Sequence, residues 1–81
     1  MRIHVLAFAR LRELLGAAQC DLELPNGALA GEAWSALVQR SPELAEQRAS
    51  TRLARNACVI SFDTPLVDGD ELALLPPVGG G

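Results

Sequence analysis

The first quarter of the chain alternates in hydrophobicity and then changes to a helical period. Residues 2–9 alternate between two faces that are both largely apolar, as in a central β-strand. Residues 10–16 place three leucines at helical spacing, and Gly16 can end this short helix in the left-handed conformation. Residues 20–24 alternate between apolar and acidic side chains, which indicates a half-exposed strand. The pattern predicts two strands joined by a helical connection.

The main helix is predicted over residues 28–40. Five of its apolar side chains lie on one stripe, with polar side chains on the opposite face. Trp34 is centred on this stripe, so we expect it to pack in the core rather than to bind a ligand. Gly31 weakens the first turn by up to about 1 kcal/mol relative to alanine. Pro42 ends or restarts the helix, and residues 43–48 are expected to add one polar turn.

Three short strands are predicted in the rest of the chain, after a loop at residues 49–52. Asn56-Ala57 supplies a tight reversal between the first two, because asparagine tolerates a positive φ. Asp68-Gly69-Asp70 is a stronger turn signal and precedes the last strand. The three strands are expected at residues 53–55, 58–62 and 71–75.

This order of elements predicts an α+β fold in which one main helix packs across one face of a mixed sheet of about five strands. In such folds the first and last strands often lie side by side at the centre. The predicted architecture is therefore a β-grasp, or ubiquitin-like roll, over residues 1–75, followed by a C-terminal tail at residues 76–81.

Composition limits the classes of partner. The chain has 81 residues, enough for one small domain, and its net charge is −3 with every basic residue an arginine. An acidic chain without a basic patch argues against binding to nucleic acid or to an anionic membrane, and suits a partner with a basic cleft. The apolar segment at residues 2–8 is too short for a signal peptide or a membrane span. With unpaired cysteines and no export signal, we expect a cytoplasmic protein.

The domain offers few candidates for catalysis or metal binding. Cys20 and Cys58 cannot form a disulfide framework, and with His4 they fall short of a four-ligand metal site, so we expect two buried thiols and a structural strand histidine. Four acidic residues lie in or directly beside predicted turns, where we expect solvated side chains rather than a catalytic pair: Asp63, Asp68, Asp70 and Glu71. We therefore predict no metal site and no bound cofactor.

The tail, Pro76 to Gly81, is the strongest functional signal. The two prolines have no N–H to donate, so they end a β-ladder and direct the chain outward. Six extended residues reach about 20 Å. The carboxylate of Gly81 has no side chain near it, which predicts a reactive group on a thin stalk.

The whole chain resembles the small subunit of molybdopterin synthase, a family of ubiquitin-like sulfur carriers. The resemblance rests on the segment from Phe8 to Gly16, on Asn56 with Ser61-Phe62-Asp63 and Pro65-Leu66, and on Asp68-Gly69-Asp70-Glu71 followed by Pro76-Pro77-Val78 and the terminal glycines. Three positions depart from the family pattern: Gly79 replaces Ser or Thr, Arg55 replaces an apolar residue, and Ala30-Gly31 replaces Thr-Val. The sequence therefore does not determine the register of the hairpin at Arg55 or the N-cap of the helix.

The resemblance implies a sulfur-transfer cycle centred on the C-terminus. An adenylating enzyme related to ubiquitin-activating enzymes would use ATP to activate the carboxylate of Gly81, and a sulfur donor would convert it to a thiocarboxylate. The tail residues Pro76, Pro77, Val78, Gly79 and Gly80 would insert into the large subunit, in a heterotetramer of two small and two large subunits. There the thiocarboxylate would supply sulfur for the dithiolene of molybdopterin, made from cyclic pyranopterin monophosphate. The catalytic groups would belong to the large subunit, so this chain would be a non-catalytic subunit.

The resemblance also implies an interface formed by Phe8, Val59 and Leu75. Phe8 and Val59 could equally be core residues, whereas Leu75 is favoured as an interface residue because it adjoins the tail. Three alternatives stay open for function: a sulfur carrier for thiamine thiazole or cysteine synthesis, a ubiquitin-like protein modifier, and a simple binding domain.

Overall fold

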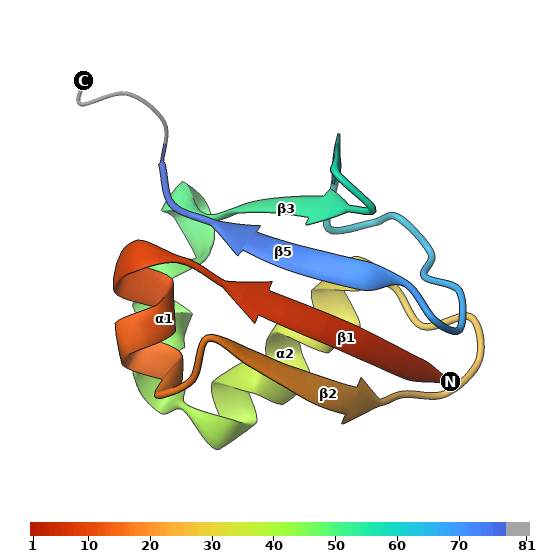
Figure 1. Ribbon diagram of the computed structural model, residues 1–81, viewed down its shortest axis with the longest axis horizontal. Helices are drawn as coiled ribbons and strands as arrows, with labels where there is room; N and C mark the ends of the chain where they lie inside the picture. The colour runs from red at the N-terminus through yellow and green to blue at the C-terminus, as the bar shows by residue number, and fades with distance from the viewer. Residues whose placement is uncertain (78–81) are drawn as a thin grey trace.

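The computed structural model describes residues 1–77. Figure 1 shows one sheet in front of two helical segments, with a short helix at one end. The elements, in chain order, are β1 (Arg2–Ala7), α1 (Ala9–Leu15), β2 (Gln19–Glu23), α2 (Ala30–Arg40), the 3₁₀ segment η1 (Pro42–Ser50), β3 (Arg52–Arg55), β4 (Cys58–Ile60) and β5 (Glu71–Leu75). Within residues 1–77, no helix is long and apolar enough to cross a bilayer.

The first and last strands form the centre of the sheet. The strand order is β2-β1-β5-β3-β4, and β1 pairs with β5 in parallel whereas the other neighbours are antiparallel. This parallel central pair confirms the predicted β-grasp fold, with one main helix, α2, behind a mixed five-stranded sheet (Figure 1). The two neighbours of β5, β1 and β3, are therefore each paired with a strand on both sides.

The core is mostly aliphatic, because the chain has only three aromatic residues. Alternate residues of β1 and β5 are fully or almost fully buried against the helices: Ile3, Val5, Ala7, Leu72 and Leu74. Trp34 of α2 is only 3% exposed and meets Phe62 edge-on, which confirms its predicted place in the core. The guanidinium carbon of Arg48 lies 4.0 Å from the centre of the Phe62 ring and covers this pair from outside.

The segment after α2 differs from the expected polar turn and loop. It is a continuous 3₁₀ segment, η1, in which Leu44 is fully buried. Pro42 stands at its start, where a missing N–H costs nothing, and the hydroxyl of Thr51 donates to the carbonyl oxygen of Gln47 at 2.7 Å at its end. One buried leucine in a mostly polar segment was too weak a periodic signal to reveal this element.

The N-terminus of α2 is capped mainly by the loop that follows β4, and of the helix's own side chains Glu32 takes part by accepting from the N–H of Leu29 at 3.4 Å. The N–H of Ala30 donates to the carbonyl oxygen of Thr64 at 2.8 Å, and the N–H of Gly31 donates to that of Phe62 at 2.7 Å. The helix therefore begins at Ala30, two residues later than predicted, and β4 ends at Ile60 so that residues 61–64 can turn toward it. This arrangement explains how the helix forms without the Thr-Val pair of the related family.

Close contact with the same loop explains Gly31. A Cβ on residue 31 would lie 3.1 Å from the carbonyl oxygen of Phe62, tighter than an ordinary van der Waals contact. Glycine therefore lowers the helix propensity of the first turn relative to alanine, but it lets this turn approach the loop closely.

The hairpin between β3 and β4 has a definite register. Asn56 and Ala57 both have positive φ, 49° and 73°, as the two central residues of a type I′ hairpin turn require. Leu53 pairs with Ile60, Ala54 with Val59 and Arg55 with Cys58. Arg55 is accommodated because its guanidinium donates to the carbonyl oxygen of Pro65 at 2.8 Å and lies 3.9 Å from the carboxylate of Asp70.

Candidate functional site

The root of the tail lies at the end of the central strand β5. Leu75, the last residue of β5, is half-buried and pairs with Arg52 of β3, and Pro76 and Pro77 follow outside the sheet. The ladder thus stops where the prolines begin. The other predicted tail residues, Val78, Gly79, Gly80 and Gly81, lie outside the described residues.

The two other predicted interface residues are exposed apolar side chains. Phe8 follows β1 directly and is 45% exposed, and Val59, in the edge strand β4, is 64% exposed. The structure therefore excludes the alternative that either is an ordinary core residue. Both are available to a partner.

An apolar row crosses the face of the sheet that points away from α2, which we call the outer face. Register places four side chains opposite one another on four neighbouring strands: Leu6 of β1, Ala73 of β5, Ala54 of β3 and Val59 of β4. Leu75 lies two residues beyond Ala73 on the same face, and Phe8 continues the alternation of Leu6. The structure thus brings Val59 and Leu75 onto one surface, with Phe8 at its tail end.

Three members of this row, Leu6, Ala54 and Ala73, were not predicted as interface residues. The sequence held a partial signal, because β1 is apolar on both of its faces although only one face can pack on α2. Ala54 and Ala73 carry no such signal. Only the cross-strand register joins them to the row.

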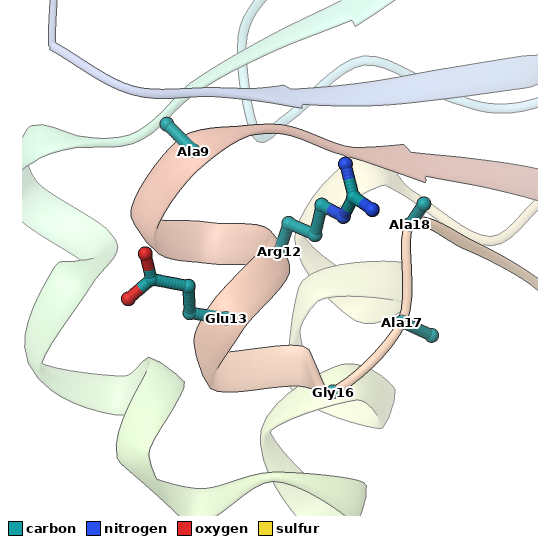
Figure 2. A pocket seen from close by; sticks show the side chains of 6 residues that line it. All are labelled: Ala9, Arg12, Glu13, Gly16, Ala17 and Ala18. Atoms are coloured by element: carbon teal, nitrogen blue, oxygen red, sulfur yellow. The ribbon is translucent and has the colours of Figure 1, made fainter.

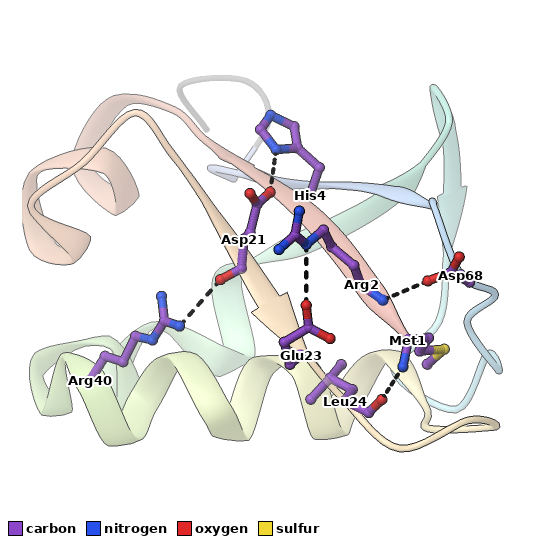
Figure 3. A network of polar contacts seen from close by, with 8 residues as sticks. All are labelled: Met1, Arg2, His4, Asp21, Glu23, Leu24, Arg40 and Asp68. Carbon is purple, nitrogen blue, oxygen red and sulfur yellow. Dashed lines mark hydrogen bonds and ion pairs between the residues drawn. The ribbon is translucent and has the colours of Figure 1, made fainter.

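The opposite end of the outer face is polar. Figure 3 shows Arg2 and His4 of β1 paired with carboxylates of β2. The Nε of Arg2 lies 3.1 Å from Oε1 of Glu23, and the Nδ1 of His4 lies 2.8 Å from Oδ1 of Asp21. Arg40 of α2 donates to the carbonyl oxygen of Asp21 at 3.2 Å, so it covers part of the free edge of β2.

His4 is held between two oxygen atoms. Its Nε2 lies 2.8 Å from Oε1 of Gln19, opposite the contact with Asp21. The hydrogen bond with Asp21 raises the pKa of His4 above 6.5, because both contacts favour an imidazolium that donates from both nitrogens. The same hydrogen bond lowers the pKa of Asp21. His4 is a structural strand residue, as predicted.

The two cysteines have different environments, and the expectation of two buried thiols was wrong. Cys58 is exposed because it adjoins the hairpin turn on the edge strand β4. Cys20 is half-buried, and desolvation raises the pKa of its thiol. Among residues 1–77, no three His, Cys, Asp or Glu side chains cluster closely enough to hold a metal ion.

The acidic turns contain one buried carboxylate, which also corrects an expectation. Asp70 is 7% exposed, and its two oxygens accept hydrogen bonds from the amide of Asn56 at 3.3 Å and from the N–H of Val67 at 2.8 Å. Asp63, Asp68 and Glu71 are exposed, as predicted. Asp70 therefore holds two turns together, which a sequence pattern of acidic turn residues does not reveal.

A pocket of about 550 Å³ lies beside α1, at the same end of the molecule as the tail root. Figure 2 shows Arg12 of α1 extending toward Ala18 of the following loop, which also contributes Ala17, while Glu13 points the other way. The remaining lining consists of Ala9 and Gly16, so the walls are short and the pocket is open. No residue predicted for function lines it.

Comparison with known proteins gives a consistent result. The profile of the ThiS family matches residues 5–81. The chain is 40% identical to the molybdopterin synthase sulfur carrier subunit of Escherichia coli strain K12, over 98% of this chain and 99% of that one. It is 37% identical to the subunit of the same name from Arabidopsis thaliana, over 100% of this chain and 84% of that one.

Solved structures give the same fold. A putative molybdopterin converting factor subunit 1 from Pyrococcus furiosus superposes with a TM-score of 0.88, at 30% identity over 96% of this chain and 99% of that one. SAMP1 from Haloferax volcanii superposes with a TM-score of 0.87, at 31% identity over both whole chains. A complex of subunits 1 and 2 of molybdopterin-converting factor from Helicobacter pylori contains a chain that superposes with a TM-score of 0.69, at 29% identity over the full length of both chains.

Proposed function

Because the chain belongs to the ThiS family, we propose that it is the sulfur carrier subunit of a molybdopterin synthase. The observation that carries this proposal is full-length identity of up to 40% to curated subunits of that name, joined to an exposed apolar surface at the root of the tail. The subunit complex from Helicobacter pylori supports a large subunit as the partner.

The proposed chemistry takes place at the carboxylate of Gly81. A carboxylate is a poor electrophile, so an adenylating enzyme first joins it to AMP from ATP and releases pyrophosphate. A sulfur donor then displaces AMP and leaves a thiocarboxylate, which is anionic and more nucleophilic at sulfur than a carboxylate is at oxygen. In the large subunit the sulfur attacks a carbon of cyclic pyranopterin monophosphate to form a C–S bond, and hydrolysis of the acyl–sulfur bond then leaves the sulfur on the pterin and returns the carboxylate of Gly81. The chain itself supplies no acid, base or metal to these steps, and it acts in the cytoplasm.

The arrangement of the domain fits this role. The tail leaves a strand that is paired on both sides, so its root is held rigidly while the glycines adapt to two enzyme sites. Ordering the tail costs about 1–2 kcal/mol per residue. The accessible members of the apolar row, with Phe8 and Leu75, offer contact area that offsets this cost, whereas Ala54 is already buried. Burial of apolar surface contributes about 25 cal/mol per Å².

Mass spectrometry of the intact chain tests the proposal. After incubation with the adenylating enzyme, ATP and a sulfur donor, the chain should gain the mass difference between one sulfur and one oxygen, at its last residue. The charged chain, mixed with the large subunit and cyclic pyranopterin monophosphate, should yield molybdopterin. An unchanged mass, under conditions that charge the Escherichia coli subunit, would contradict the proposal.

A second function, protein modification, is favoured by one observation. SAMP1, a small archaeal modifier protein, superposes on this chain as well as the converting-factor subunit does. A modifier would form an amide with a lysine of its target, and that bond survives thiol treatment. A lysate that shows charged chain but no such adducts supports the sulfur carrier, and stable adducts on other proteins support the modifier.

A further inference from the structure

Arg52 occupies an unusual place beside the root of the tail. It opens β3 and pairs in register with Leu75, the last residue of β5. Its side chain is exposed on the outer face, on the same side of β3 as Ala54 of the apolar row. A cation thus stands at the margin of an otherwise aliphatic surface.

Arg52 has no partner among residues 1–77. Arg2, Arg10 and Arg55 each lie within 4 Å of a carboxylate of this chain, at 3.1, 3.1 and 3.9 Å. Arg52 makes neither an ion pair nor a side-chain hydrogen bond within the described part of the chain. No group of residues 1–77 therefore occupies the guanidinium donors of Arg52.

Charge on the outer face is divided between its two ends. The end far from the tail carries Asp21, Glu23 and Glu71, in register with His4 and Arg2. The tail end carries Arg52 opposite Leu75. A partner whose carboxylate met the far end would be repelled, whereas the same carboxylate beside the tail would be attracted.

We propose that Arg52 is a specificity residue that pairs with a carboxylate of the partner protein, at the rim of the opening that receives the tail. This inference rests on the proposed function, since it assigns the orientation in which the large subunit meets the outer face. Arginine suits this position because its planar guanidinium binds a carboxylate through two parallel hydrogen bonds.

A protein carboxylate fits Arg52 better than a nucleotide phosphate does. The group that is adenylated lies six residues beyond Leu75, at Gly81. An extended chain of that length spans about 20 Å, which is far longer than an arginine side chain. When the tail is threaded into an enzyme site, the phosphate therefore lies beyond the reach of Arg52, while the surface around the opening lies next to it.

The test measures binding of the uncharged full-length chain to the large subunit from the same genome, at several salt concentrations. Arg52→Leu should weaken binding about two- to fivefold at low salt, as expected for one exposed ion pair, and should make binding less dependent on salt. Arg52→Lys should retain much of the affinity, and Arg52→Glu should weaken it further than leucine does. Arg2→Leu is the matched control, because Arg2 lies on the same face at the far end and is paired with Glu23.

The outcomes separate this inference from the proposed function. Unchanged affinity and salt dependence in Arg52→Leu, with normal binding by the wild type, would overturn the inference alone. An equal loss in Arg2→Leu and Arg52→Leu would also overturn it, since it would reflect net charge rather than position. If the wild type does not bind the large subunit at all, the proposed function fails, and the inference fails with it. Thermal unfolding of each variant identifies any loss that reflects misfolding.

Discussion

Asn56 and Glu71 exchange two hydrogen bonds across the sheet. The backbone N–H of Asn56 donates to the carbonyl oxygen of Glu71 at 3.0 Å, and the N–H of Glu71 donates to Oδ1 of Asn56, also at 3.0 Å. The side-chain amide of Asn56 then donates to the buried Asp70. One residue of the β3–β4 turn therefore fixes the start of β5, the strand that leads to the tail.

Replacement of Asn56 should destabilise the domain through two separate effects. Asn56→Ala removes the acceptor for the N–H of Glu71 and also places alanine at a φ of 49°, so we expect a loss of about 2–3 kcal/mol of unfolding free energy. Asn56→Gly removes the same amide but tolerates the backbone, so its loss should be about 1 kcal/mol smaller. Urea unfolding measures both, and equal losses would show that the backbone conformation contributes nothing.

Leu74 and Leu75 are neighbours with opposite roles. Leu74 is fully buried in the core, and Leu75 is half-buried on the outer face. Leu74→Ala should cost about 2–5 kcal/mol of stability, whereas Leu75→Ala should cost about 1 kcal/mol or less but weaken binding to the large subunit by more than fivefold. Thermal unfolding would rank the two variants by loss of stability, and calorimetric titration would rank them by loss of affinity for the large subunit. A larger stability loss in Leu75→Ala would place that side chain in the core instead.

The pair of His4 and Asp21 should make stability depend on pH in two directions. The pKa of His4 is raised, so its contribution is complete below about pH 6.5 and is lost as the pH rises through the folded-state pKa. The pKa of Asp21 is lowered, so its contribution is present above its ordinary pKa and is lost as the pH falls through the folded-state value. The pair therefore stabilises most at pH values between the ordinary pKa of Asp21 and the ordinary pKa of His4.

Titration of the imidazole by NMR checks this prediction directly. The midpoint for His4 should lie above 6.5 in the wild type, and it should fall in Asp21→Asn, which removes the largest cause of the shift. A midpoint that stays unchanged in Asp21→Asn would show that the hydrogen bond to Asp21 does not set the pKa.

The two thiols should react at different rates. Cys58 is exposed, whereas Cys20 is half-buried with a raised pKa, so alkylation at neutral pH should modify Cys58 several times faster. Peptide mapping after timed iodoacetamide treatment identifies the modified residue. In urea the two rates should converge, and a persistent difference there would mean that local sequence rather than burial sets the reactivity.

The tail should be essential for sulfur transfer and dispensable for folding. Deletion of Gly81, or addition of one residue after it, displaces the reacting carboxylate, so we expect no molybdopterin formation above background in the synthase assay. The melting temperature should stay unchanged, because the core and all five strands lie within residues 1–75. Normal activity in either variant would refute the proposed chemistry.

The main elements of this fold were accessible from sequence because each carries its own local signal. Alternation marked β1 and β2, a single apolar stripe marked α2, and Gly16 ended α1 in the left-handed conformation as predicted, with a φ of 80°. The β-grasp topology followed from the order of elements. The η1 segment was not predicted, because Leu44 is its only buried residue. The exact start of α2 was not predicted, because the groups that cap it come from residues 62–64.

The residues of the candidate site could be predicted from the sequence only in part, for a different reason. Leu75 could be placed by its position next to the tail, and Phe8 and Val59 by resemblance to a family. Ala54, Ala73 and Arg52 join them only through register, which depends on contacts between strands far apart in sequence. The buried role of Asp70 was hidden likewise, because its partner Asn56 lies 14 residues away.

The double pairing of β5 has a mechanical consequence. Hydrogen bonds to β1 and β3 run across the strand, and Pro76 follows its last residue directly. A pull applied to Leu75 along the axis of β5 would therefore load both ladders in shear, so that many bonds resist together instead of opening one by one. Under the proposed function, in which the C-terminus is repeatedly withdrawn from enzyme sites, the domain can thus bear traction without unfolding.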